Sequence, residues 1–391
     1  MATALAVSLG LVWYVYIGYP ALVWALARLF GRPPVPPAVE AADLPSVTLL
    51  VVAHNEERDI GARIENALSL HYPRDRFEIV IASDGSTDAT NDIVRRYANR
   101  GVVLLAFPTN RGKAAVLNDA FRLVKGDVVV LSDANTHMAA DAIRHLGEWF
   151  ADPDVGVVCG KLALVDSQSG KNVDGAYWKY ENFLKKCESR LGALLGTNGA
   201  IYAIRRRLFP GATDGLVIDD FVIPMTARLR SGCRIQYDPR AVASEETPAD
   251  LGSEFRRRCR IGAGGYQAIG RLWPLLNPRH GWVAFTFLSH KVLRWLCPFF
   301  LVAGFGLNVA LLDQSVFRGL FGLQVGFYGA AFAAHFLPAR PRFFRYLKLT
   351  TMFVLMNAAL FVGFFRWTLG RQGGTWQRTA RTGAGVPGTN A

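Results

Sequence analysis

Five polar clusters in this sequence carry residue types that can do chemistry. They are "HNEE" at 54–57, "SDGSTD" at 83–88, "SDAN" at 132–135, "IDD" at 218–220 and the basic, glycine-rich "RRRCRIGAGGYQ" at 256–267. Carboxylate and amide oxygens can hold a hard divalent cation. A carboxylate can also act as a general base, and arginines can grip a pyrophosphate with paired donors.

Asp133 and Asn135 follow the apolar run that ends at Leu131. Their side chains point the same way along an extended chain, because side chains alternate. Both can offer oxygen ligands to Mg²⁺ or Mn²⁺, which would complete its shell with phosphate oxygens. The alternative is an Asx turn with no ligand.

Three further carboxylates each have a functional and a structural interpretation. Asp84 follows a strand, where it can accept hydrogen bonds from a base or a ribose, or else cap a helix. Asp219 and Asp220 are adjacent, and one could be the general base for a hydroxyl nucleophile. The alternative is an N-cap for the helix "FVIPMTARLR", with Pro224 in its first turn.

Four arginines lie close together in a predicted loop or helix start. They could bind a pyrophosphate, or form a basic face against anionic lipid. They are Arg256, Arg257, Arg258 and Arg260.

Strands that alternate with helices must position these groups. The expected strands are Val47–Ala53, Phe77–Ala82, Val102–Ala106 and Val128–Leu131, with helices at Ile60–Leu70, 88–98 and 113–124. This order predicts βαβ units and a doubly wound α/β sheet. Ligands bind such sheets at the carboxyl ends of the strands, where the polar clusters fall.

Apolar segments at both ends predict membrane helices. The chain has 391 residues, of which 51% are hydrophobic, and Ala4–Ala27 is uncharged and long enough to cross a bilayer. Arg28 and Arg32 follow it, so the positive-inside rule places the next part in the cytoplasm. Further spans are expected at Trp295–Leu312, Val316–Leu337 and Leu347–Thr368, after an amphipathic interface helix over 282–295.

The net charge of +13 suits anionic lipid or an anionic substrate. A nucleic-acid partner is not expected, because zinc-finger spacing and a basic helix-turn-helix pattern are both lacking. The five scattered cysteines contain no CxxC pair, which indicates free thiols in a reducing compartment.

In this order and spacing, the clusters from Val47 to Gln267 resemble a family 2 glycosyltransferase of the GT-A fold. The flanking apolar segments resemble those of the membrane-bound synthases of cellulose, hyaluronan and poly-N-acetylglucosamine. The expected architecture is an α/β, Rossmann-like GT-A domain between transmembrane helices. Its parts are an N-terminal transmembrane helix (1–30), a proline-rich linker (31–46), a cytoplasmic GT-A domain (47–278), an interface helix with about three transmembrane segments (279–370) and a basic tail (371–391).

The resemblance implies a nucleotide-sugar site. Glu56 and Asp84 match the nucleotide-binding loops, and Lys113 in "RGKAAVLN" matches a lysine near the donor. Asp133 matches the first residue of the DxD motif, which binds the donor diphosphate through Mg²⁺ or Mn²⁺. Asn135 stands where that motif has its second aspartate, and keeps an oxygen ligand without the charge.

An acceptor side is implied in the same way. Thr197, Asn198 and Gly199 in "GTNGAIYAIRR" resemble the acceptor-side loop. Asp219 and Asp220 resemble an acidic pair whose second member is the catalytic base.

The last motif departs from the family in two places. Arg260 matches the arginine that stabilises the diphosphate, but Arg257 replaces the family's glutamine, for which Gln267 is a weak substitute. Ile261 replaces the usual tryptophan that would stack on an acceptor sugar. Trp376 resembles part of a closing segment of these synthases.

The resemblance implies an inverting transfer from a nucleotide-sugar, UDP-linked by expectation, to a growing polysaccharide at a bacterial-type inner membrane. Its partners would be the donor, a glycan or lipid-linked acceptor, membrane lipid and accessory export subunits. Ile261 leaves open a single-sugar transfer to a lipid acceptor. Because Asn135 replaces the second aspartate of the DxD motif, a catalytically inactive membrane scaffold that senses nucleotide-sugar is a remaining alternative.

Overall fold

A computed structural model describes residues 1–165, 176–246, 251–336 and 342–371. The predicted basic tail after Arg371, with Trp376, lies outside the described residues. The described chain divides into two compact units, an α/β unit and a helical unit. The α/β unit takes in residues 26–249 and 271–284, and the helical unit takes in 1–25, 250–270 and 285–372.

Among the described residues, one mixed sheet of eight strands organises the α/β unit, in the order β3-β2-β1-β4-β7-β6-β8-β5. The strands are β1 Val47–Ala53, β2 Phe77–Asp84, β3 Val102–Phe107, β4 Val128–Asp133, β5 His137–Met138, β6 Val155–Val165, β7 Tyr202–Arg205 and β8 Arg234–Glu246. The predicted parallel part, β3-β2-β1-β4, is present. The antiparallel pairs β4–β7, β6–β7 and β5–β8 were not predicted.

The register places the predicted polar clusters at one edge of the parallel strands. Ala53, the last residue of β1, lies opposite Ser83 of β2, and Val52 lies opposite Asp133 of β4. The residues that follow β1 and β2, and the carboxylate that ends β4, are therefore neighbours.

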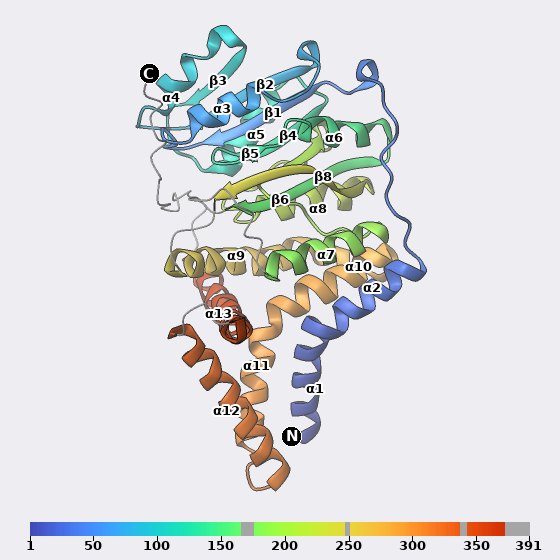
Figure 1. The fold of residues 1–391 in the computed structure, drawn as a ribbon, viewed down its shortest axis with the longest axis vertical. Helices are drawn as coiled ribbons and strands as arrows, with labels where there is room; N and C mark the ends of the chain where they lie inside the picture. Colours follow the sequence, from blue (N-terminus) through green and yellow to red (C-terminus); the bar gives the residue numbers. More distant parts are fainter. Residues whose placement is uncertain (166–175, 247–250, 337–341, 372–391) are drawn as a thin grey trace. The chain divides into compact units, whose positions relative to one another are not determined.

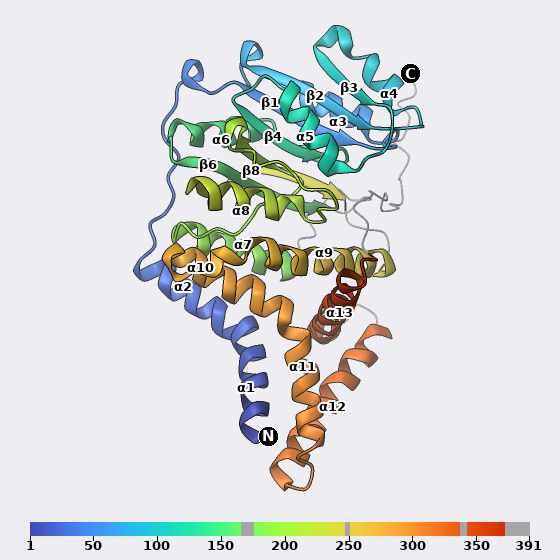
Figure 2. The ribbon, with the colours of Figure 1, turned by 180° about the vertical axis from the view of Figure 1, so that it is seen from behind.

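Helices cover both faces of the sheet, as Figures 1 and 2 show from opposite sides. They are α3 Ile60–Leu68, α4 Thr90–Arg95, α5 Lys113–Leu123, α6 Ala142–Glu148, α7 Ala176–Arg190 and α8 Asp219–Ser231. Apolar residues of α3, α4 and α6 share one core with alternate strand residues such as Leu49 and Val51. All seven residues of β1 are buried, as expected for a strand covered on both faces.

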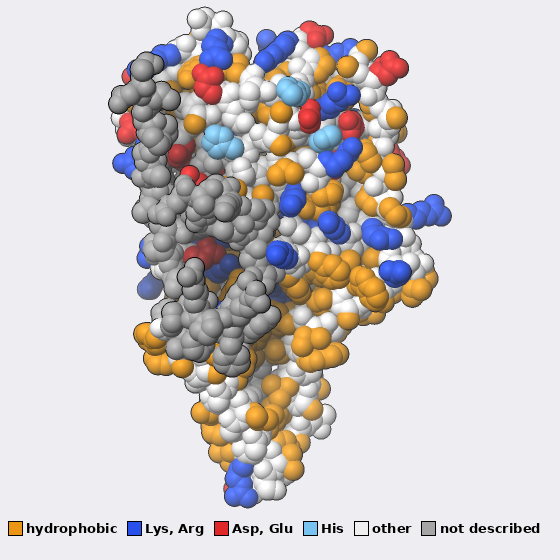
Figure 3. Space-filling model, viewed as in Figure 1, with side chains coloured by type: hydrophobic (Ala, Val, Ile, Leu, Met, Phe, Trp, Pro, Cys, Tyr) orange, Lys and Arg blue, Asp and Glu red, His pale blue; other side chains and the backbone are white. Residues whose placement is uncertain are grey.

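Four helical stretches of the described residues are long and apolar enough to cross a membrane. Most of their residues belong to the helical unit. These candidate spans are Ala2–Leu29, Trp282–Val309, Ser315–Ala334 and Leu347–Thr368. Their elements are α1 Ala2–Trp13, α2 Tyr19–Leu29, α10 Trp282–Thr286, α11 Leu293–Val309, α12 Ser315–Phe336 and α13 Arg342–Thr368. Hydrophobic and uncharged groups cover most of the visible surface over α1, α11 and α12 (Figure 3).

The segment 282–295, predicted as a separate interface helix, continues into α11. A π-helical segment, Phe287–Val292, joins α10 to α11, so that the whole stretch is one candidate span. The second candidate span, Trp282–Val309, therefore begins earlier than the predicted Trp295.

The arginine-rich motif is a helix, α9 Leu251–Leu272, and not a loop. Its small residues allow close packing within the helical unit. A Cβ on Gly262 would lie 3.2 Å from the Cα of Leu360 of α13, and the Tyr266 hydroxyl donates a hydrogen bond to the Trp295 carbonyl. The glycines thus let α9 approach α13 at backbone distance.

Candidate active site

Asp84 fastens the loop that precedes α5. Its side chain is 1% exposed, and its two oxygens accept hydrogen bonds from the backbone N–H groups of Arg111 (2.8 Å) and Gly112 (2.9 Å). The helix-cap interpretation is wrong, because the N-cap of α4 is Ala89. The role predicted for Asp84, contact with a nucleotide, stays a prediction.

The "HNEE" cluster follows β1 and lies beside this loop, at the carboxyl edge of the sheet. The Nδ1 atom of His54 lies 2.7 Å from the Asp84 carbonyl oxygen, and the Asn55 side chain accepts a hydrogen bond from the Thr87 N–H at 2.8 Å. Glu56 is buried, and its backbone N–H donates to the Thr90 hydroxyl at 2.8 Å. Three loops that lie far apart in sequence are thus joined by hydrogen bonds at the carboxyl edge of the sheet.

Lys113, at the start of α5, bridges two carboxylates. Its Nζ atom lies 3.1 Å from Oδ1 of Asp133 and 3.1 Å from Oδ2 of Asp219. Burial lowers the pKa of Lys113, but the two carboxylates together outweigh burial and leave that pKa raised. The lysine therefore stays protonated, and it brings the end of β4 together with the start of α8.

Asp219 and Asp220 occupy the first turn of α8. The N-cap interpretation is wrong, because Ile218 holds the cap position. Carboxylates are favoured in a first turn by the positive end of the helix dipole. Burial, and then the Asp219 charge, nevertheless raise the pKa of Asp220 to about 6. A raised pKa near the working pH is typical of a catalytic carboxylate.

Gly199 lies between the predicted metal ligand and the predicted base. A Cβ on Gly199 would lie 3.2 Å from Oδ2 of Asp133 and 3.9 Å from Oδ2 of Asp220. The missing side chain leaves room beside both carboxylates. The structure therefore brings the DxD-like aspartate, the acidic pair and the predicted acceptor-side loop together.

Pro224 lies inside α8, beyond the first turn that the sequence predicted for it. Proline has no N–H, so the carbonyl of Asp220, four residues earlier, loses its helical partner. Thr197 replaces that partner, because its N–H (3.0 Å) and its hydroxyl (2.6 Å) both donate to the Asp220 carbonyl. Thr197 therefore holds the backbone of the predicted base.

Asn198 also has a structural role in this loop. Its side-chain amide donates to the Gly160 carbonyl at 2.8 Å and accepts from the Ile201 N–H at 3.1 Å. The side chain is buried. Of the three predicted acceptor-side residues in this loop, Gly199 is the one whose added side chain would lie beside the carboxylates of Asp133 and Asp220.

Thr197→Val should lower kcat about tenfold with little change in the donor KM. A misplacement of a reacting group by 1 Å can lower the rate about 100-fold. We expect a smaller loss here because the valine variant keeps the backbone N–H that also donates to the Asp220 carbonyl. Steady-state kinetics of Thr197→Val and Thr197→Ser would check this, because serine keeps the hydroxyl. Equal losses in the two variants, or a change confined to KM, would show that the hydroxyl does not position Asp220.

Two residues near the carboxylates were missed in the sequence. Lys185 of α7 lowers the pKa of Asp220, and its Nζ atom lies 3.7 Å from the Cys159 sulfur. Tyr202 of β7 is buried, and its hydroxyl has no hydrogen-bond partner among the described residues. Burial raises the pKa of Tyr202, and the nearby aspartates raise it further. A single lysine in a helix and a single tyrosine in an apolar strand form no sequence motif that would indicate a functional site.

The described residues include no group of three or more His, Cys, Asp or Glu side chains that could hold a metal. Asp133, whose side chain is 26% exposed, and Asn135 can still offer two oxygens. Mg²⁺ commonly takes one or two protein carboxylates together with substrate phosphates. The predicted alignment of the two side chains along an extended chain is wrong, because β4 ends at Asp133 and Asn135 lies in the turn that follows. A carboxylate and an amide oxygen still suit a divalent cation that arrives with a diphosphate.

Three predicted site residues lie on α9 of the helical unit. Arg257 pairs with Glu254 at 2.9 Å, Arg260 is exposed and Gln267 is partly buried. Their contacts with donor or acceptor stay predictions.

Residues 48–209 match the model of a known family, Glycosyl transferase family 2. This part of the chain is similar to a family 2 glycosyl transferase domain. The match covers Asp84, Lys113 and Asp133, and it ends before Asp219 and Asp220. The match supports the enzyme class predicted from the sequence, a glycosyltransferase.

Curated relatives point to the same transferase class. The chain is 28% identical over 243 residues to the poly-beta-1,6-N-acetyl-D-glucosamine synthase of Staphylococcus aureus (strain COL), covering 60% of this chain and 58% of that protein. It is 28% identical over 251 residues to Probable glycosyltransferase YdaM of Bacillus subtilis (strain 168), covering 58% and 57%. The chain thus matches less than two thirds of the length of these relatives.

A solved structure confirms the fold of the transferase domain. The mannosyltransferase of Pyrobaculum calidifontis, in complex with GDP-Man and Mn²⁺, superposes with a TM-score of 0.72 at 23% identity. The similarity covers 94% of this chain and 99% of that one. The predicted α/β, Rossmann-like GT-A fold with flanking candidate membrane helices is confirmed.

Proposed function

We propose that this glycosyltransferase moves a sugar from a nucleotide-sugar to a growing polysaccharide, with inversion and with a divalent metal. The observation that carries the proposal is the meeting of Asp133 and Asp220 beside Gly199. One carboxylate faces the expected donor diphosphate, and the other has a pKa raised to about 6. The similarity to a poly-beta-1,6-N-acetyl-D-glucosamine synthase supports the choice of a polysaccharide.

In this proposal Asp220 takes the proton from the acceptor hydroxyl. Thr197 fixes the helix turn that carries Asp220, and Lys113 fixes Asp133 against α8. A single base and direct attack on the donor sugar give inversion, so that an α-linked donor yields a β-linked product. A Mg²⁺ or Mn²⁺ ion held by Asp133 and Asn135 would neutralise charge on the leaving diphosphate.

We also propose a location at the inner face of a bacterial-type inner membrane. In this arrangement residues 1–30 and 279–370 lie in or on the membrane, and the transferase domain over 47–278 lies in the cytoplasm. The four candidate spans and the positive-inside rule support it. Accessory export subunits and membrane lipid are its expected partners.

Transfer of a single sugar to a lipid acceptor is the second candidate. Ile261 on α9 supports it, because an isoleucine cannot stack on an acceptor sugar as a tryptophan does. A guanosine donor is a further option, since the solved mannosyltransferase is bound to GDP-Man. Product length and nucleotide preference separate these candidates.

The test uses the full chain in membranes, supplied with one donor at a time and with Mg²⁺ or Mn²⁺. UDP-N-acetylglucosamine, UDP-glucose, UDP-glucuronic acid and GDP-mannose form the panel, and nucleotide release and product mass are measured. We expect one UDP-sugar to give nucleotide release and a polymer, both abolished by EDTA. A product that is a lipid with one sugar would contradict the polysaccharide, and release that persists in EDTA would contradict the metal.

A further inference from the structure

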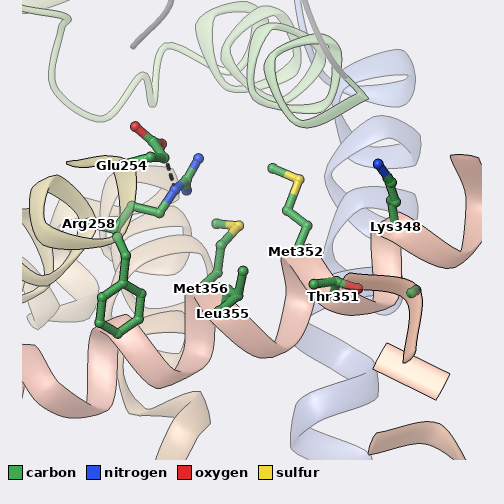
Figure 4. Close-up of a pocket in the computed structure, with 9 residues that line it drawn as sticks. Glu254, Arg258, Lys348, Thr351, Met352, Leu355 and Met356 are labelled. Carbon is green, nitrogen blue, oxygen red and sulfur yellow. Dashed lines mark ion pairs between the residues drawn. The ribbon is translucent and has the colours of Figure 1, made fainter. Parts of the chain in front are cut away.

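A cavity of about 280 Å³ lies within the helical unit, between α9, α12 and α13. The residues that line it include Glu254, Phe255, Arg258, Lys348, Met352 and Met356. In Figure 4 the side chains of Lys348, Met352 and Arg258 extend to the same side, with Met352 between the two cationic residues. The cavity therefore combines an apolar wall with cationic groups.

The apolar wall suits a hydrocarbon chain. Met352, Leu355 and Met356 of α13 contribute it, together with Phe255 of α9 and Ala334 of α12. Methionine side chains are flexible and adapt to irregular apolar partners. Both α12 and α13 contain candidate membrane spans, so lipid is the expected surrounding of this wall.

The charges of the cavity do not balance. Glu254 pairs with Arg257 at 2.9 Å and with Arg258 at 2.7 Å, so one carboxylate faces two guanidinium groups. Lys348 adds a further positive charge, and it forms no ion pair with any described residue. Of the described residues that line the cavity, Arg258 and Lys348 are cationic and Glu254 is anionic, which leaves a surplus of one positive charge that favours an anion.

We propose that this cavity binds an anionic phospholipid of the membrane. The phosphate lies between Lys348 and Arg258, and part of one acyl chain lies against Met352 and Met356. Basic pockets between membrane helices are known to hold anionic lipid headgroups. The volume of about 280 Å³ lies just below the ~300–1,000 Å³ of typical ligand pockets, so the cavity admits only part of a lipid. This inference does not depend on the proposed reaction.

Native mass spectrometry of the full chain in detergent tests the proposal by counting bound lipids. Phosphatidylglycerol and the zwitterionic phosphatidylcholine are titrated in separate samples. We expect phosphatidylglycerol to bind more tightly, and Lys348→Gln to weaken its binding about fivefold. Lys348→Arg keeps the charge and should bind like the wild type, as should Arg318→Gln, which removes an exposed cation of α12 outside the cavity.

Several results would overturn the proposal. They are equal affinity for the two lipids, an unchanged affinity in Lys348→Gln, and an equal loss in Arg318→Gln. Displacement of phosphatidylglycerol by glycerol phosphate would show a site for the free headgroup. Tighter, Lys348-dependent binding of an isoprenoid phosphate would assign the cavity to a lipid-linked acceptor.

Discussion

Asp220→Asn should lower kcat by about 10²–10⁴-fold, the range that a positioned general base contributes. Asparagine keeps the size of the side chain but cannot take the proton from the acceptor. Initial rates of nucleotide release at saturating donor and acceptor would measure the effect. Asp214→Asn is the matched control, because Asp214 is an exposed aspartate that precedes the same helix. A kcat of Asp220→Asn within a few-fold of the control would contradict the assignment.

The same carboxyl group predicts a pH dependence of rate and of stability. A base with a pKa of about 6 is ionised above that pH, so kcat should fall as the pH drops through about 6. The folded pKa lies above the ordinary value of 3.8, so the stability that Asp220 contributes when protonated is lost as the pH rises through about 6. Asp220→Asn should therefore melt at or above the wild-type temperature at pH 7.5. A much lower melting temperature would mean that its loss of activity reflects unfolding.

Asp133→Asn should raise the metal concentration that gives half-maximal activity and lower kcat/KM about 100-fold or more. A metal that polarises a phosphoryl oxygen supplies several kcal/mol, and each 1.4 kcal/mol corresponds to about tenfold in rate. Asn135→Asp should lower the metal concentration that gives half-maximal activity, because it adds a negatively charged ligand. Activity titrations with Mn²⁺ and Mg²⁺ would measure both variants.

Donor binding provides a second readout for this pair of variants. Titration calorimetry with a nucleoside diphosphate and Mn²⁺ should show weaker binding to Asp133→Asn and tighter binding to Asn135→Asp. Unchanged binding in both variants would mean that the metal does not lie at Asp133. Lys113 would then be the candidate for the cation that faces the diphosphate, since it already pairs with Asp133 at 3.1 Å.

The parallel half of the sheet was predictable because its strands are continuous apolar runs. Val47–Ala53 is buried along its whole length, and the predicted bounds of that strand match the structure. The other half was not predicted, because β7 pairs with β4 and β6 across long sequence separations. No local pattern shows which strand such a segment will pair with.

The site was predictable as a set of residues but not as a set of contacts. The carboxylates at positions 84, 133, 219 and 220 were identified from type and spacing. The burial of Asp84 against the backbone of residues 111–112 depends on the fold of a later loop. The hydrogen bond from Thr197 to the Asp220 carbonyl likewise depends on Pro224. The sequence predicted Pro224 in the first turn of the helix, whereas it lies further inside α8 and leaves that carbonyl without a helical donor.

The measurement that tests the central claim most directly is donor binding and turnover in one preparation of Asp220→Asn. Purified full chain would be titrated with the active nucleotide-sugar and Mn²⁺, and sugar transfer would then be assayed in the same sample. If Asp220 is the base, the donor dissociation constant should stay within a few-fold of the wild type while transfer falls about 10²-fold or more. Full transfer at unchanged donor binding would contradict the claim, and so would a loss of transfer that follows entirely from lost donor binding.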